Sequence, residues 1–323
     1  MDVLRGTAIG LVIINHSILF AGQQGDLPEP IEAFNSVFAP VRMPLMVFLS
    51  GLLVAPSLRK GWRQYTVGKL RRILWPYLVW SVIVVGIDSA TDLATGGGVP
   101  WGDWLRVLYS PLAHLWFLYY LLAYYAIALI TRKMNALVVA TVALGACVFA
   151  PDDSWSRFLL LLAAFMAGKW VSDRPQRLEA AIAHPIVVIL ASAVFAVGAA
   201  VAVAGVDLRY EAVSAPLVAG GVIAAIAASQ RIQHARALRP VRFVGRFSLV
   251  FYLSHWYGVI VAVQLADRVI GNPLATFAAG VLGGTAAGVA LAWVVRLVPP
   301  VNALFEFPRR AALRRNNVNA DRV

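Results

Sequence analysis

Residues 5–16 read RGTAIGLVIINH, and they lie within the first long apolar run of the chain, residues 3–22. A run of about 20 apolar residues is long enough to cross the hydrocarbon core of a bilayer as one helix. Arg5 and His16 are the two ionisable side chains in this run. Ionisable groups inside a span cost free energy unless they are used or paired, so both are candidate site residues.

The spacing of Arg5 and His16 places both side chains on one face of the expected helix. Eleven steps make close to three full turns and a rise of roughly 16 Å, so the arginine lies near one membrane face and the imidazole near mid-depth. Asn15 and Ser17 flank the histidine. Two interpretations stay open: a buried histidine that hydrogen-bonds a neighbouring helix, or a general base or acyl carrier in an intramembrane cavity.

The composition of the whole chain is typical of a membrane protein. Of its 323 residues, 60% are hydrophobic and only 14% are charged, which excludes an ordinary soluble domain of this length. The net charge of +12 comes from short basic clusters between apolar runs. That distribution is typical of topology signals, and it argues against nucleic-acid binding. The single Cys147 excludes a disulfide framework and a metal site of cysteines, and we expect no metal.

Ten apolar runs are long enough, or nearly so, to span a bilayer. Only PDDSW separates the fifth run from the sixth. With the N-terminus inside, 23 of the 28 Lys and Arg residues fall in cytoplasmic segments. The outer side keeps Arg42, Arg106, Arg157, Arg209 and Arg268. The sequence predicts an all-α, polytopic membrane bundle of about ten transmembrane helices over residues 1–308, with N- and C-termini cytoplasmic, followed by a basic, disordered cytoplasmic tail over 309–323. The ten runs are residues 3–22, 40–57, 73–90, 111–131, 135–150, 156–171, 185–205, 213–229, 247–266 and 274–297.

Two segments in the first third of the chain are candidates for a site. In VRMPLMVFLSGLLV, residues 41–54, Pro44 permits a kink, and Ser50 and Gly51 allow close helix approach, although simple packing is the preferred explanation of this segment. KLRRILWPY, residues 69–77, places Lys69, Arg71 and Arg72 at the cytoplasmic mouth of the third run. This cluster is an orientation signal that is also suited to the phosphates of an anionic cosubstrate.

Three later segments add aromatic and polar groups. Trp116, in HLWFLYYLLAYY at residues 114–125, is expected in an interfacial aromatic belt, where it either anchors the helix or stacks on a sugar ring. In GRFSLVFYLSHW, residues 245–256, Ser248, Tyr252 and His255 share one helix face and form a second polar stripe that could meet the first. Glu306 in FEFPRR either pairs with an arginine of its own segment, Arg309 or Arg310, or reaches an arginine of the site.

Together these segments resemble the integral-membrane acyltransferase family 3, whose members O-acylate sugars of surface polysaccharides, lipopolysaccharide and related molecules. The resemblance covers almost the whole chain, from DVLRG through RMPLMVFLSG, KLRRILWPY, HLWFLYY and GRFSLVFYLSH to FEFP. The family hallmark, an arginine and a histidine with ten residues between them on the first span, is matched by Arg5 and His16. A basic R-x-x-R pair of the family has Lys69 at its first position here. HLWFLYY is similar to the fucose O-acetylase branch.

The resemblance implies a bacterial inner-membrane enzyme that moves an acyl group, most simply acetyl, from cytosolic acyl-CoA to a hydroxyl of a carbohydrate or glycan acceptor. His16 is then the catalytic base or an acyl relay, and Arg5 a second catalytic residue near the donor. Such a bundle is compatible with an oligomer. The implied donor-binding residues are Lys69, Arg71 and Arg72, and the implied substrate-lining residues are Asn15, Trp116, Tyr252, His255 and Glu306.

Two other functions fit the same sequence. A transporter or flippase of a lipid-linked sugar would also need about ten spans and a polar interior stripe, but it would use no CoA. An inactive relative serving as a scaffold is the second alternative, and the presence of both Arg5 and His16 argues against it.

Overall fold

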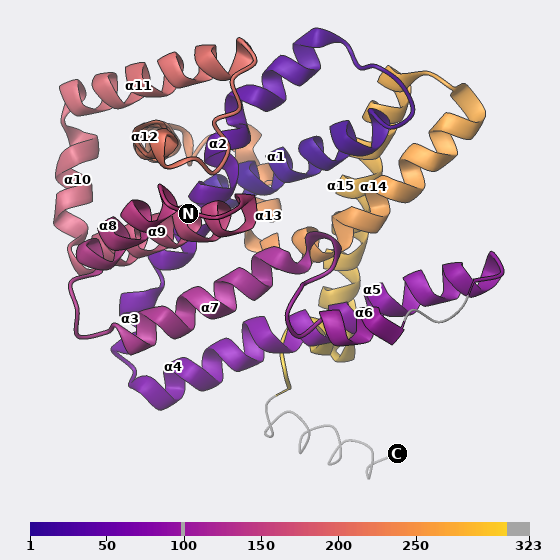
Figure 1. The fold of residues 1–323 in the computed structure, drawn as a ribbon, viewed down its shortest axis with the longest axis horizontal. Helices are drawn as coiled ribbons and strands as arrows, with labels where there is room; N and C mark the ends of the chain where they lie inside the picture. Colours follow the sequence, from indigo (N-terminus) through magenta and orange to yellow (C-terminus); the bar gives the residue numbers. More distant parts are fainter. Residues whose placement is uncertain (98–100, 309–323) are drawn as a thin grey trace. The chain divides into compact units, whose positions relative to one another are not determined.

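The computed structural model describes residues 1–97 and 101–308, and over these ranges the chain is built of helices without strands (Figure 1). The predicted all-α class is confirmed. The tail predicted at 309–323 lies outside the described residues. The chain divides into two compact units, the first comprising Met1–Arg59 and Ile127–Leu291 and the second comprising Lys60–Ala126 and Ala292–Val323.

The first unit contains the N-terminal helices and most of the second half of the chain. Its helices are α1 (Asp2–Ala21), α2 (Glu29–Gly51), α3 (Val54–Leu58), α8 (Ala136–Cys147), α9 (Asp153–Asp173), α10 (Pro175–Ala183), α11 (Pro185–Val203), α12 (Ala215–Ile232), α13 (Arg239–Arg246) and α14 (Ser248–Ile270), with short 3₁₀ turns at Ala212–Ser214 and Arg236–Leu238.

The second unit is smaller and centres on the third apolar run. Two long helices, α7 (Trp116–Ile130) and α15 (Pro273–Leu297), contribute residues to both units. The remaining elements are α4 (Trp62–Lys69), a π-helical turn η1 (Leu70–Leu74), α5 (Trp75–Ala94), α6 (Trp101–Arg106) and two 3₁₀ segments, Ala113–Leu115 and Pro299–Leu304.

Eight helical stretches in the described part of the chain are long and apolar enough to cross a membrane. The two other predicted runs form α8 and α9. The 12 residues of α8 rise only about 18 Å, which is short for a bilayer of about 30 Å. Helix α9 is long enough to cross a bilayer, but it carries charges at both ends, among them Asp153, Lys169 and Asp173. The count of spans stays even if both helices cross the membrane or if neither does.

Helix α2 begins well before the apolar run that predicted it. The run starts at residue 40, whereas the helix starts at Glu29, directly after Pro28. It continues through Pro40 and Pro44, and its second half is almost entirely buried. Hydropathy located the membrane-embedded part of this helix and missed its polar extension, because helical hydrogen bonding does not stop where the apolar residues do.

The core of the first unit is formed by α1, α2 and α9 with their neighbours. Helix α1 packs against α2, α13 and α14, and α2 packs against α9, α11 and α12. At the α2–α9 crossing, a Cβ added to Gly51 or Gly168 would collide with a backbone carbonyl of the other helix. Small residues at crossings let two backbones approach closely, which is how membrane helices gain packing energy without a hydrophobic driving force.

Candidate active site

Helix α1 carries both hallmark residues in one unbroken segment. The helix runs over Asp2–Ala21 without interruption, so Arg5 and His16 share a face as the spacing predicts. The start of α1 is fixed against α13, because Gly6 lies directly on the Val241 carbonyl and Gly245 directly on the Asp2 carbonyl. A side chain at either glycine would force the two helices apart. This crossing sets the position of α14, which follows α13 after a single residue.

The two polar stripes predicted from the sequence meet at His16 and His255. Nδ1 of His16 on α1 lies 2.9 Å from Nε2 of His255 on α14, although the residues are 239 positions apart in the chain. The ring centroids are 5.0 Å apart, with the ring planes tilted by 34°. The two nitrogens are at hydrogen-bonding distance and the rings are not stacked, so one imidazole donates a hydrogen bond to the other.

His255 is held on its other side by its own helix. Its Nδ1 lies 2.7 Å from the carbonyl oxygen of Tyr252 and 3.1 Å from that of Phe251. The ring is fully buried. A buried polar group persists when it is hydrogen-bonded, and here both ring nitrogens have partners. Tyr252 therefore contributes its carbonyl to the site, while its ring lies 6.0 Å from the ring of His255.

The His16 ring is only half-buried, unlike that of His255. The edge of the Trp256 indole lies against it, with ring centroids 5.0 Å apart, and Trp256 also contacts Phe20 one turn further along α1. Aromatic side chains on one side and His255 on the other fix the ring orientation. The pair thus combines a fully buried, doubly bonded histidine with a half-buried one.

The first unit also buries Arg42, which the charge distribution predicts on the outer side of the membrane. Arg42 lies in α2 and is only 7% exposed. Its guanidinium donates to Oδ1 of Asn35 at 3.0 Å and lies 3.5 Å from the Leu11 carbonyl on α1. A cation inside an apolar run is itself a site signal, and VRMPLM, near the start of the run 40–57, contains one.

Two further predicted residues lie on α1 beside this pair. Asn15, adjacent to His16 in sequence, is half-buried, and so is Arg5 near the start of the helix. Arg5 stands about three turns from His16, which by helix geometry is roughly 16 Å. It is therefore too far to contact the imidazole directly, and any joint action of the two requires an extended ligand.

The predicted basic cluster lies in the second unit, on a π-helical turn. In η1 the Trp75 N–H bonds the Leu70 carbonyl, five residues back. The next donor in this register would be residue 76, but Pro76 has no N–H. The Arg71 carbonyl is therefore left without a helical partner, and the Phe307 N–H supplies one at 3.0 Å. Such π turns occur frequently at functional sites.

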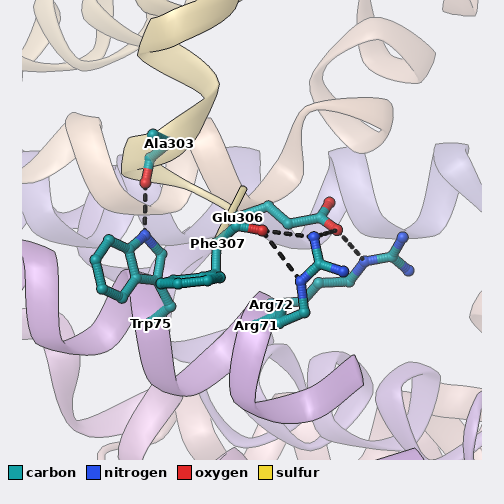
Figure 2. A network of polar contacts seen from close by, with 6 residues as sticks. All are labelled: Arg71, Arg72, Trp75, Ala303, Glu306 and Phe307. Atoms are coloured by element: carbon teal, nitrogen blue, oxygen red, sulfur yellow. Dashed lines mark hydrogen bonds and ion pairs between the residues drawn. The ribbon is translucent and has the colours of Figure 1, made fainter. Parts of the chain in front are cut away.

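The Phe305–Phe307 segment also engages the arginine side chains (Figure 2). Arg71 donates Nε and Nη2 to the Phe307 carbonyl at 3.1 and 2.6 Å. Glu306 lies 3.3 Å from Nε of Arg72 and 3.7 Å from Nη2 of Arg71. Of the two partners predicted for Glu306, the structure gives the arginines of the cluster, while Arg309 and Arg310 lie outside the described residues.

The indole of Trp75 completes this clamp. Its Nε1 donates to the Ala303 carbonyl at 2.6 Å, and the Phe307 ring meets it edge-on at 4.8 Å (Figure 2). One carboxylate faces two guanidinium groups here, so the cluster keeps an excess of positive charge. Such an arrangement suits a further anion, because arginine forks match phosphate oxygens.

Lys69 and Trp116 are engaged elsewhere in the second unit. The Lys69 ammonium lies 3.7 Å above the centroid of the Tyr125 ring and 5.4 Å from that of Tyr65, whose hydroxyl donates to the Tyr125 carbonyl. This is a cation–π site formed by two tyrosines. Trp116 contacts Tyr120 edge-on at 5.4 Å. Both the anchoring and the sugar-stacking interpretation of Trp116 are compatible with this packing.

One of three comparisons with known proteins gave a match. A family model described as an acyltransferase domain matches residues 1–297, almost the whole chain. The comparison with curated proteins and the comparison with solved structures gave no match. The matched range includes the α1 arginine and histidine, the basic π turn and the α14 histidine. The chain therefore belongs to acyltransferase family 3, a family of membrane acyltransferases.

Proposed function

We propose that this protein transfers an acyl group, acetyl in the simplest case, from cytosolic acyl-CoA to a hydroxyl of a carbohydrate or glycan acceptor in a bacterial inner membrane. The observation that carries the proposal is the His16–His255 hydrogen bond inside a membrane acyltransferase domain.

The chemistry assigned to His16 is general-base catalysis. The acceptor hydroxyl gives its proton to the imidazole as its oxygen bonds to the thioester carbon. The carbon–sulfur bond then breaks, and the CoA thiolate takes that proton from the imidazolium. An acyl-histidine relay would use the same nitrogen as the nucleophile. The Arg42 guanidinium provides positive charge for the oxyanion that develops on the thioester oxygen.

The donor-binding role is assigned to Arg71 and Arg72. CoA is polyanionic, and two guanidinium groups that share one carboxylate retain attraction for phosphate. In this proposal Glu306 and the Phe307 carbonyl keep the arginines ordered until a phosphate replaces part of these contacts. Lys69 adds positive charge from its tyrosine cage.

Binding of CoA gives a direct test. The purified protein in lipid nanodiscs is heated with CoA, with acetyl-CoA and with ATP as a polyanion control, and its Tm is recorded. A ligand at 100 times its Kd stabilises the folded state by about 2.7 kcal/mol. We expect both acetyl-CoA and free CoA to raise Tm, and we expect the rise in Tm to be smaller in Arg71→Met. An unchanged Tm at millimolar CoA, or equal stabilisation by ATP, would favour a non-enzymatic function.

A further inference from the structure

We propose that His255 is a positioning residue that fixes the proton of His16 on Nδ1, and thereby makes Nε2 of His16 the single basic atom of the site. This inference rests on the proposed function for its catalytic consequence. The tautomer itself follows from hydrogen bonds that the structure shows, and it can be measured without any activity assay.

The hydrogen-bond chain begins at a group that can only accept. The carbonyl oxygens of Tyr252 and Phe251 have no proton to give, so Nδ1 of His255, at 2.7 and 3.1 Å from them, must carry the hydrogen. In a neutral imidazole the other nitrogen is then a bare acceptor. Nε2 of His255 therefore presents a lone pair to His16.

The same reasoning passes to the second ring. Nδ1 of His16 lies 2.9 Å from Nε2 of His255, and two lone pairs would repel each other at this distance. Nδ1 of His16 must therefore donate, which leaves Nε2 of His16 unprotonated in the neutral pair.

The arrangement remains favourable when His16 takes up a proton. The incoming proton binds Nε2, and the imidazolium keeps its Nδ1–H bond to His255, now strengthened by the charge. No group has to rotate between the two states. His255 cannot turn away either, because its ring is fully buried and tied to its own helix by two carbonyls. Preorganisation of this kind is what a group that orients a catalytic base supplies in hydrolase triads.

Magic-angle-spinning NMR of the full-length protein in lipid, labelled with ¹⁵N-histidine, tests the tautomer. The His16 resonances are assigned by their loss in His16→Gln. We expect His16 to be neutral with its hydrogen on Nδ1. A hydrogen on Nε2 of His16, or a doubly protonated ring in the resting protein at neutral pH, would overturn the inference.

Two variants test the positioning role. The amide oxygen of Gln reaches about the position of a histidine Nε2, so His255→Gln keeps an acceptor for His16, whereas His255→Leu removes it at similar volume. With acetyl-CoA and the acceptor, we expect kcat of His255→Leu to fall at least about 10-fold with little change in KM, and His255→Gln to recover most of the rate. The positioning role would be contradicted if His255→Leu had the kcat of the wild type. It would also be contradicted if His255→Gln had a kcat as low as that of His255→Leu.

The two proposals fail in different ways. If the wild-type protein transfers no acyl group but His16 carries its hydrogen on Nδ1, the proposed function is wrong and the tautomer assignment stands. If acyl transfer occurs and depends on His16 while His255→Leu is fully active, the function stands and the positioning role is wrong. The Tm of each variant shows whether it is folded, and the NMR test on the wild type needs no variant of His255.

Discussion

The crossing of α2 and α9 yields a stability prediction with a matched control in the same chain. A Cβ at Gly168 would lie far inside 3.0 Å of the Phe48 carbonyl, a distance that real Cβ atoms essentially never show, and the obstructing atom is backbone. At Gly10, in the middle of α1, a Cβ would meet nothing within 4 Å. Gly168→Ala must therefore separate two helices, whereas Gly10→Ala fills open space.

The expected magnitudes differ in sign. Overpacking a well-packed site costs about 1–3 kcal/mol, and more where the backbone itself must move. An alanine in a helix with free space gains about 0.5–1 kcal/mol over glycine. At about 2–4 °C per kcal/mol for a protein of moderate size, Gly168→Ala lowers Tm by roughly 2–10 °C, while Gly10→Ala leaves Tm unchanged or raises it slightly.

Thermal unfolding of the purified variants in one detergent, at one scan rate and one protein concentration, provides the measurement. Matching the conditions is necessary because membrane proteins often unfold irreversibly, which makes Tm dependent on scan rate. If Gly168→Ala unfolds at the same temperature as Gly10→Ala, the close crossing of α2 and α9 is wrong, and the helix order of the first unit must be revised.

Three further predictions concern charged residues. Arg42→Met leaves Tm within a few degrees of wild type, because removing a buried cation removes a desolvation cost, yet it lowers acyl transfer at least about 10-fold; full activity would show that the charge is not used. Arg71→Met raises the KM for acyl-CoA with little change in kcat, since it removes phosphate binding and not chemistry; an unchanged KM in a steady-state titration would oppose this. Hydrogen bonds from Arg209 lower the pKa of Asp207, so this pair stabilises the protein above the ordinary carboxyl pKa and loses that contribution as pH falls. Both side chains are more than half exposed, so Arg209→Ala lowers Tm only slightly at pH 7 and by less at pH 3, and a large effect at either pH would contradict an exposed pair.

Hydropathy and spacing predicted the long helices and the shared face of Arg5 and His16 because both depend only on local sequence. The meeting of the two polar stripes was also foreseeable, because polar side chains in a lipid-embedded bundle avoid the lipid and face one another in the interior. The clamp on Arg71 was not foreseeable. Pro76 has no N–H to offer the Arg71 carbonyl, and this carbonyl instead accepts a hydrogen bond from the N–H of Phe307, which is 236 positions away in the chain. Such long-range pairing leaves no periodic signal.

Arg42 shows a different limit of pattern reading. Its charge was visible two residues after the predicted start of the run 40–57, where a cation is readily interpreted as an orientation signal at the membrane face. The structure extends the helix to Glu29 and buries the guanidinium against α1. Where a helix begins therefore decides whether a charge near its end is an orientation signal or part of a site.

The central claim is that His16 performs acyl transfer, and a genetic measurement tests it most directly. Cells that lack the gene are complemented with wild type, with His16→Ala, or with His184→Ala, an exposed histidine at the start of α11 that serves as the control. Mass spectrometry of their glycans then reports O-acyl groups at matched membrane levels of each variant. We predict that wild type and His184→Ala restore an acyl group that His16→Ala does not. Restoration by His16→Ala at the wild-type level would contradict the account.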